Sequence, residues 1–136
     1  MNELNKLAQH HRKQALLYER LANGLPTPRS RAVLLGFARE DLQSAALLLE
    51  ADYLQNGYAR LQEEQAFELP ALPCEELFKQ CILEEAALAR RYLLLADGCT
   101  DAYLRSLFLR LSQKARQRVT RLPILLFDLP SQENAP

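Results

Sequence analysis

Five polar residues occupy positions where the surrounding helical pattern is apolar, and their side chains are of types that could do chemistry. They are His11, Asp41, Ser44, Glu85 and Arg118. Imidazole and carboxylate groups are metal ligands, whereas a guanidinium is a permanent cation that binds carboxylates through a rigid fork of N–H donors. Because a buried carboxylate needs a partner, we expect Glu85 and Arg118 to form a buried ion pair, with Asp41 and His11 close by.

Each of these residues also has an ordinary structural interpretation. His11 is predicted to be a buried, hydrogen-bonded histidine. It cannot share one ion with His10, because adjacent residues of a helix point about 100° apart. Tyr18 and Tyr92 are predicted to be core residues whose hydroxyls reach a polar neighbour. No residue is assigned a catalytic role, and neither a metal nor another cofactor is predicted.

Four amphipathic helices must position these side chains, because apolar residues recur at the spacing that buries one face of a helix. The expected helices run from about Asn2 to Asn23, from Pro28 to Gln55, from Cys74 to Ala96, and from a cap at Thr100 or Asp101 to Leu122. Thr27 is expected to cap the second helix, with Pro28 at its first position. Pro123 is expected to end the fourth.

The second pair of helices is similar in sequence to the first. A shift of 74 residues places Tyr92 on Tyr18 and Gly98 on Gly24. The chain is therefore predicted to be all-α and to contain two copies of one helical hairpin. We expect a single four-helix bundle over residues 1–130.

A long crossover over residues 57–73 would join the two hairpins. The second helix has an expected length of about 42 Å, and the extended crossover reaches about 50 Å. The crossover can therefore run the length of a bundle, or its part from Tyr58 to Ala66 can extend the second helix. The apolar segment from Ile124 to Phe127 would fold over the end of the bundle or cover a second subunit. Residues 131–136 are expected to be a disordered tail.

The third and fourth predicted helices carry a family resemblance. Glu85 lies seven residues before Tyr92, and Leu95-Ala96, a tight turn and an apolar helix follow. This arrangement resembles the rubrerythrin branch of the ferritin-like superfamily. The resemblance implies a ferritin-like four-helix bundle that holds two iron or manganese ions. The first and third helices would each supply a Glu, and the second and fourth would each supply a Glu-x-x-His pair.

Most of the implied ligand positions depart from the family pattern. Carried over one at a time, the six positions hold His11, Asp41, Ser44, Glu85, Ala115 and Arg118. Only Glu85 matches, although Asp41 and His11 are possible substitutes. Ala115 supplies no donor atom, and the guanidinium of Arg118 would strongly repel a dication. The resemblance thus supports the fold and argues against the family's chemistry.

The predicted function is therefore a non-catalytic ferritin-like bundle that has lost its dimetal site. It would act as a binding or interaction protein, in a structural or adaptor role, as a homodimer through a helix face or the apolar tail. One alternative is a metal-dependent oxidoreductase with a rearranged mono- or dimetal site on His11, Asp41 and Glu85, with Glu19 or Glu40 as further candidates. Another is a small-molecule binder that uses the polar pocket left by the missing metals.

Composition limits the expected partners and location. Lys plus Arg equals Asp plus Glu at 17 each, so no global field attracts nucleic acid or an anionic membrane. The fourth predicted helix carries five basic residues that do not share one face, namely Arg110, Lys114, Arg116, Arg118 and Arg121. There is no apolar run of about 18 residues and no apolar leader segment. Three cysteines with no Cys-x-x-Cys pair are typical of a reducing compartment, so we expect a cytoplasmic protein without nucleic-acid or membrane partners.

Overall fold

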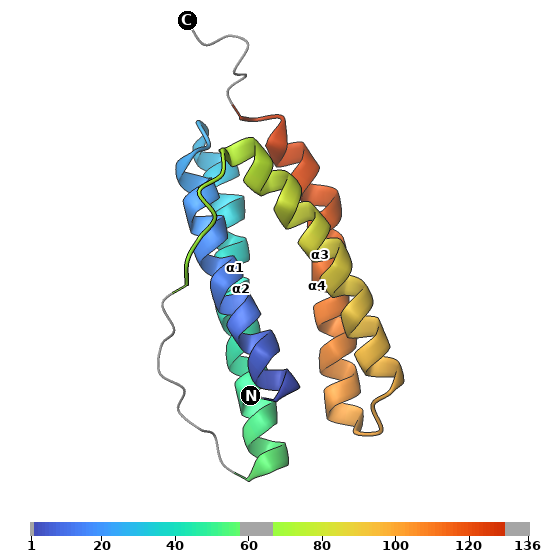
Figure 1. Ribbon diagram of the computed structural model, residues 1–136. Coiled ribbons are helices and arrows are strands. Elements are labelled where there is room, and N and C mark those ends of the chain that lie inside the picture. The colour runs from blue at the N-terminus through green and yellow to red at the C-terminus, as the bar shows by residue number, and fades with distance from the viewer. Residues whose placement is uncertain (1, 58–66, 130–136) are drawn as a thin grey trace, which may run out of the picture. The chain divides into compact units, whose positions relative to one another are not determined.

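The computed structural model describes residues 2–57 and 67–129, and within them every regular element is a helix. The helices are α1 (Glu3–Asn23), α2 (Pro28–Asn56), α3 (Cys74–Asp97) and α4 (Ala102–Leu126), shown in Figure 1. The all-α prediction is confirmed. No helix in the described part of the chain is both long enough and apolar enough to cross a membrane.

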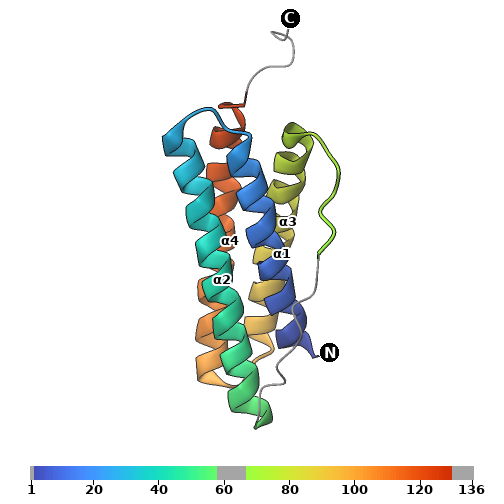
Figure 2. The same cartoon turned by 90° about the vertical axis from the view of Figure 1, so that its left-hand side faces the viewer.

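The chain divides into two compact units, Met1–Ala71 and Leu72–Pro136. In the first unit α1 packs against α2, and in the second α3 packs against α4. Figures 1 and 2 both show the two helices of each unit running side by side in opposite directions. Each unit is therefore a helical hairpin, as the sequence repeat predicts.

The two hairpins turn at corresponding positions. α1 ends at Asn23 and α3 ends at Asp97, 74 residues later, and the starts of α2 and α4 differ by the same shift. Thr27 caps α2 by accepting a hydrogen bond from the Ser30 N–H at 3.3 Å, with Pro28 at the first helical position. Asp101, rather than Thr100, caps α4. Side-chain oxygens at this position satisfy backbone N–H groups that a helix leaves unpaired, so both turns follow from the local sequence.

Each hairpin buries one tyrosine against a phenylalanine of its second helix. Tyr18 meets Phe37 edge-on, with ring centroids 5.6 Å apart, and Tyr92 stacks on Phe108 at 5.9 Å. Both tyrosines are fully buried. Aromatic pairs at such separations add to the stability that burial alone gives. The two tyrosines of the repeat are thus part of the packing between the helices of each hairpin, as expected for core residues.

The prediction that Pro123 ends the fourth helix is wrong, because α4 continues to Leu126 with Pro123 inside it. A proline removes one N–H donor from the helix but need not stop it when neighbouring side chains favour continuation. Leu125 is buried in the added turn, whereas Ile124 and Phe127 are 70% and 90% exposed. Ile124 to Leu126 therefore form the last turn of α4, and Phe127 follows it as the C-cap residue.

The end of α2 also departs from regular helix at one defined point. Gly57 has a φ of +83°, a left-handed conformation that glycine adopts without steric cost. Residues 67–73 of the crossover have no regular secondary structure. The possible extension of α2 over residues 58–66 and the tail at 131–136 lie outside the described residues.

Candidate functional site

His11 and Asp41 form a buried polar pair between α1 and α2. Nδ1 of His11 lies 2.9 Å from Oδ1 of Asp41, and the side chains are 6% and 1% exposed. An imidazole N–H in this position donates to the carboxylate, which holds the ring in one orientation. The hairpin places the two side chains together because both fall on the buried stripes of facing helices.

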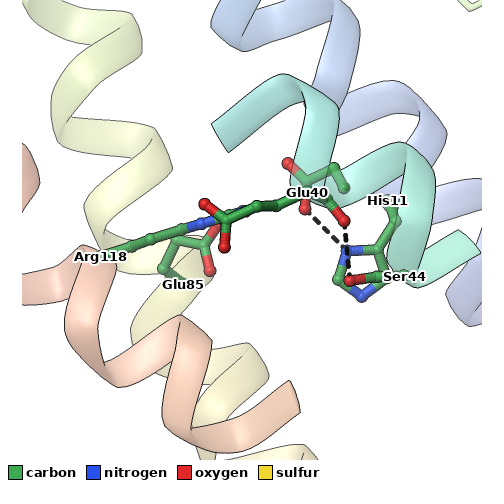
Figure 3. A network of polar contacts seen from close by, with 6 residues as sticks. His11, Glu40, Ser44, Glu85 and Arg118 are labelled. Atoms are coloured by element: carbon green, nitrogen blue, oxygen red, sulfur yellow. Dashed lines mark hydrogen bonds and ion pairs between the residues drawn. The ribbon is translucent and has the colours of Figure 1, made fainter. Parts of the chain in front are cut away.

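Ser44 is buried on α2 one turn after Asp41. Its hydroxyl donates a hydrogen bond to the backbone carbonyl oxygen of Glu40 at 3.0 Å, as Figure 3 shows. This bond back to the preceding turn is a common way for serine to satisfy its hydroxyl within a helix. Ser44 therefore has a structural partner within α2.

Glu85 and Arg118 form the expected ion pair between α3 and α4. Nη1 of Arg118 lies 3.2 Å from Oε1 of Glu85, and the two side chains are 5% and 1% exposed respectively. Figure 3 shows the two side chains next to each other. Two opposite charges held together away from water attract one another far more strongly than at the surface. Without its partner, each charge would lose its hydration with no compensating attraction. The pair is therefore expected to hold α3 and α4 in this register.

A second hydrogen bond links α3 and α4 close to this pair. The hydroxyl of Ser112, which is 1% exposed, donates to the backbone carbonyl oxygen of Ala89 at 2.8 Å. Ala115 is also buried and contributes only a methyl group. Sequence reasoning missed Ser112, although its place on the buried face of α4, one turn before Ala115, was a usable signal.

The two hairpins carry their charges in opposite order. The repeat aligns His11 with Glu85, and Ser44 with Arg118. In the first hairpin the acid lies on the second helix, at Asp41, whereas in the second hairpin the acid lies on the first helix. Each hairpin thus pairs its own acid with its own base. The structure brings together His11 with Asp41 and Glu85 with Arg118, and these two pairs belong to different hairpins.

Sequence reasoning also missed a polar cluster around Asp52, which is 5% exposed. Its Oδ1 accepts a hydrogen bond from Nδ2 of Asn2 at 2.6 Å, and its Oδ2 accepts from Nδ2 of Asn5 at 2.7 Å. Nδ2 of Asn56 also donates to Oδ1. This cluster joins the start of α1 to the end of α2. The spacings of Asn2 with Asn5, and of Asp52 with Asn56, which put each pair on one helix face, were the available signal.

The residues present do not fit the dimetal group that the family resemblance implies. Among the described residues, neither hairpin gathers three or more His, Cys, Asp or Glu side chains in a group that could hold a metal ion. Glu85, the one matching position, is bound to the guanidinium of Arg118, and Asp41 is bound to His11. Glu19, a further candidate ligand, is exposed.

A surface groove of about 530 Å³ lies on the hairpin of α3 and α4. Its lining residues are Leu93, Leu109, Ser112, Gln113, Arg116, Gln117 and Thr120. Most of these side chains are exposed, and neither Glu85 nor Arg118 is among them. The groove is therefore distinct from the buried polar pair of this hairpin.

Comparisons of the chain with models of known protein families, with curated proteins and with solved structures find no match.

Proposed function

We propose that this protein is a non-catalytic, ferritin-like four-helix bundle that acts as a binding or interaction protein, in a structural or adaptor role. Its expected location is the cytoplasm, and its expected assembly is a homodimer. The order of the helices supports this proposal, because two tight hairpins joined by a long connection are the connectivity of ferritin-like bundles. Two buried pairs support the non-catalytic role as well, because His11 is bound to Asp41 and Glu85 is bound to Arg118.

The observation that carries the proposal is the bond between Arg118 and Glu85. The family resemblance assigns Glu85 to a metal and would place a histidine where Arg118 stands. Arginine stays charged at any pH that a protein tolerates. A dication at Glu85 would have to break the 3.2 Å contact and move a guanidinium that is buried. The pair therefore supports a structural role for Glu85.

Charge and donor atoms support the same proposal. A dimetal site in a helical bundle uses four carboxylates and two imidazoles, whose negative charges offset two dications. The corresponding positions here include two acids, Glu85 and Asp41, together with one arginine and an alanine at position 115. The remaining net negative charge is too small to offset two dications, and Ala115 has no atom that binds a metal.

Elemental analysis tests this proposal. Protein purified without chelators or a metal-affinity tag is expected to carry no stoichiometric iron, manganese or zinc, and to turn over neither hydrogen peroxide nor oxygen. The result that would overturn it is a metal present at one ion or more per chain and lost in His11→Ala but retained in the control His10→Ala. That result would favour the oxidoreductase alternative on His11, Asp41 and Glu85.

A further inference from the structure

The side of α3 opposite Glu85 and Tyr92 carries two of the most exposed leucines of the described chain. Leu83 is 71% exposed and Leu94 is 72% exposed. They belong to a row of residues that alternate in steps of three and four, namely Gln80, Leu83, Ala87, Arg90, Leu94 and Asp97. We call this row the α3 seam. Steps of three and four are the spacing by which one helix packs along another.

The leucines of the α3 seam do not recur at the aligned positions of α1. A shift of 74 residues places Leu83 on Gln9 and Leu94 on Arg20. The corresponding positions of α1 are therefore polar at both leucines, and Gln9 is only 6% exposed where Leu83 is 71% exposed. Two highly exposed leucines at positions where only one of two similar helices carries them indicate an interaction specific to that helix.

We propose that the α3 seam binds the α3 seam of a second copy of this chain, with the two helices antiparallel about a two-fold axis. This inference rests on the proposed interaction role of the protein and names the surface that would carry it. In this register Leu83 packs against Leu94 of the partner subunit, and Ala87 packs against Arg90 of the partner subunit. Because a two-fold contact is self-complementary, each of these contacts occurs twice.

The charges beside the α3 seam fit this antiparallel register. Glu84 and Arg91 flank the seam on the same side, seven residues apart. In antiparallel pairing, Glu84 faces Arg91 of the partner subunit, and the two-fold axis repeats the same ion pair at the other end. A parallel pairing would instead set Arg90 against Arg90 of the partner subunit inside the seam. Charge complementarity therefore selects the antiparallel arrangement.

The length of the α3 seam sets the expected strength of the dimer. About 18 residues span roughly 27 Å along a helix about 10 Å wide. A contact of this size lies at the low end of specific protein interfaces. The small side chain of Ala87 leaves room for the aliphatic stem of the facing arginine, whose charged end reaches water. We therefore expect a reversible dimer whose dissociation constant is on the order of micromolar.

Charge reversal tests the register on the full-length protein. Glu84→Arg sets Arg against Arg twice, and Arg91→Glu sets Glu against Glu twice, so each variant alone is expected to raise the dimer Kd by about 10- to 100-fold. An equimolar mixture of the two variants regains both attractive pairs and is expected to dimerise again. Sedimentation equilibrium measures all three samples, with Arg110→Glu on α4 as the control that leaves the Kd unchanged.

Leucine truncation tests the apolar part of the same contact. Leu83→Ala is expected to raise the Kd by at least about tenfold, whereas Leu54→Ala, which removes an exposed leucine from α2, should leave it unchanged. A dimer unaffected by Glu84→Arg and Leu83→Ala would overturn the α3 interface but leave the interaction role standing. A wild-type protein that is monomeric at its highest soluble concentration would overturn the α3 interface and the proposed homodimer together.

Discussion

At the scale of single residues, Glu85 and Arg118 should matter more to stability than any exposed charge. Arg118→Ala leaves the carboxylate of Glu85 buried without its cation and is expected to lower the free energy of unfolding by about 3–5 kcal/mol. The double variant Glu85→Leu/Arg118→Met removes both charges and keeps the volume, so it should lose much less. Urea melts of the two variants provide the measurement.

Arg110→Ala serves as the control for this comparison, because Arg110 is an exposed arginine of the same helix. It should change the free energy of unfolding by no more than about 0.5 kcal/mol. A loss below about 1 kcal/mol in Arg118→Ala would contradict a strong buried pair, since such values are typical of surface ion pairs.

At the scale of helices, Asp52 joins the start of α1 to the end of α2 by accepting three amide hydrogen bonds. Asp52→Ala leaves the three side-chain amide groups without their acceptor, and the amide group of Asn5 is buried. We therefore expect the free energy of unfolding to fall by about 2–3 kcal/mol. The first turn of α1 should also exchange its amide protons faster. Urea melts and hydrogen exchange measure the two effects.

Glu50→Ala is the matched control, because Glu50 is an exposed acid two residues earlier on the same helix. It should change the free energy of unfolding by no more than about 0.5 kcal/mol. The amide exchange rates of the first turn of α1 should stay as in the wild type. Equal effects of Asp52→Ala and Glu50→Ala would show that the amide bonds do not hold the two helix ends together.

The helices themselves were largely predictable, and the exception has a physical reason. The bounds of α1, α2 and α3 follow from spacing, caps and glycines that act within a few residues. The C-terminal end of α4 was not predicted, because Pro123 is a local stop signal that the burial of Leu122 and Leu125 outweighs. Whether a proline ends a helix depends on what the following turn can bury, and that is a property of the packed hairpin.

At the scale of the whole molecule, the proposed four-helix bundle predicts that the two hairpins unfold as one cooperative unit. A chain the length of one hairpin buries a smaller fraction of its surface than the full chain does, so one hairpin alone is expected to be only marginally stable. Asp52→Ala, which weakens only the first hairpin directly, should therefore also lower the protection of α3 and α4 amides in hydrogen exchange. Retained protection of α3 and α4 in this variant would show instead that the hairpins are independent folding units.

The sequence by itself determined the helices, most of their ends, their buried faces and the repeat of one hairpin, because each depends on residues a few positions apart. It also placed His11, Asp41, Ser44, Glu85 and Arg118 on buried faces, because each interrupts an apolar stripe. The sequence further predicted the pair of Glu85 with Arg118, whereas only the tertiary structure decided that His11 binds Asp41, that three asparagine amides meet Asp52, and that α4 runs through Pro123. These outcomes depend on side chains brought together from distant parts of the chain, and local spacing does not specify such distances.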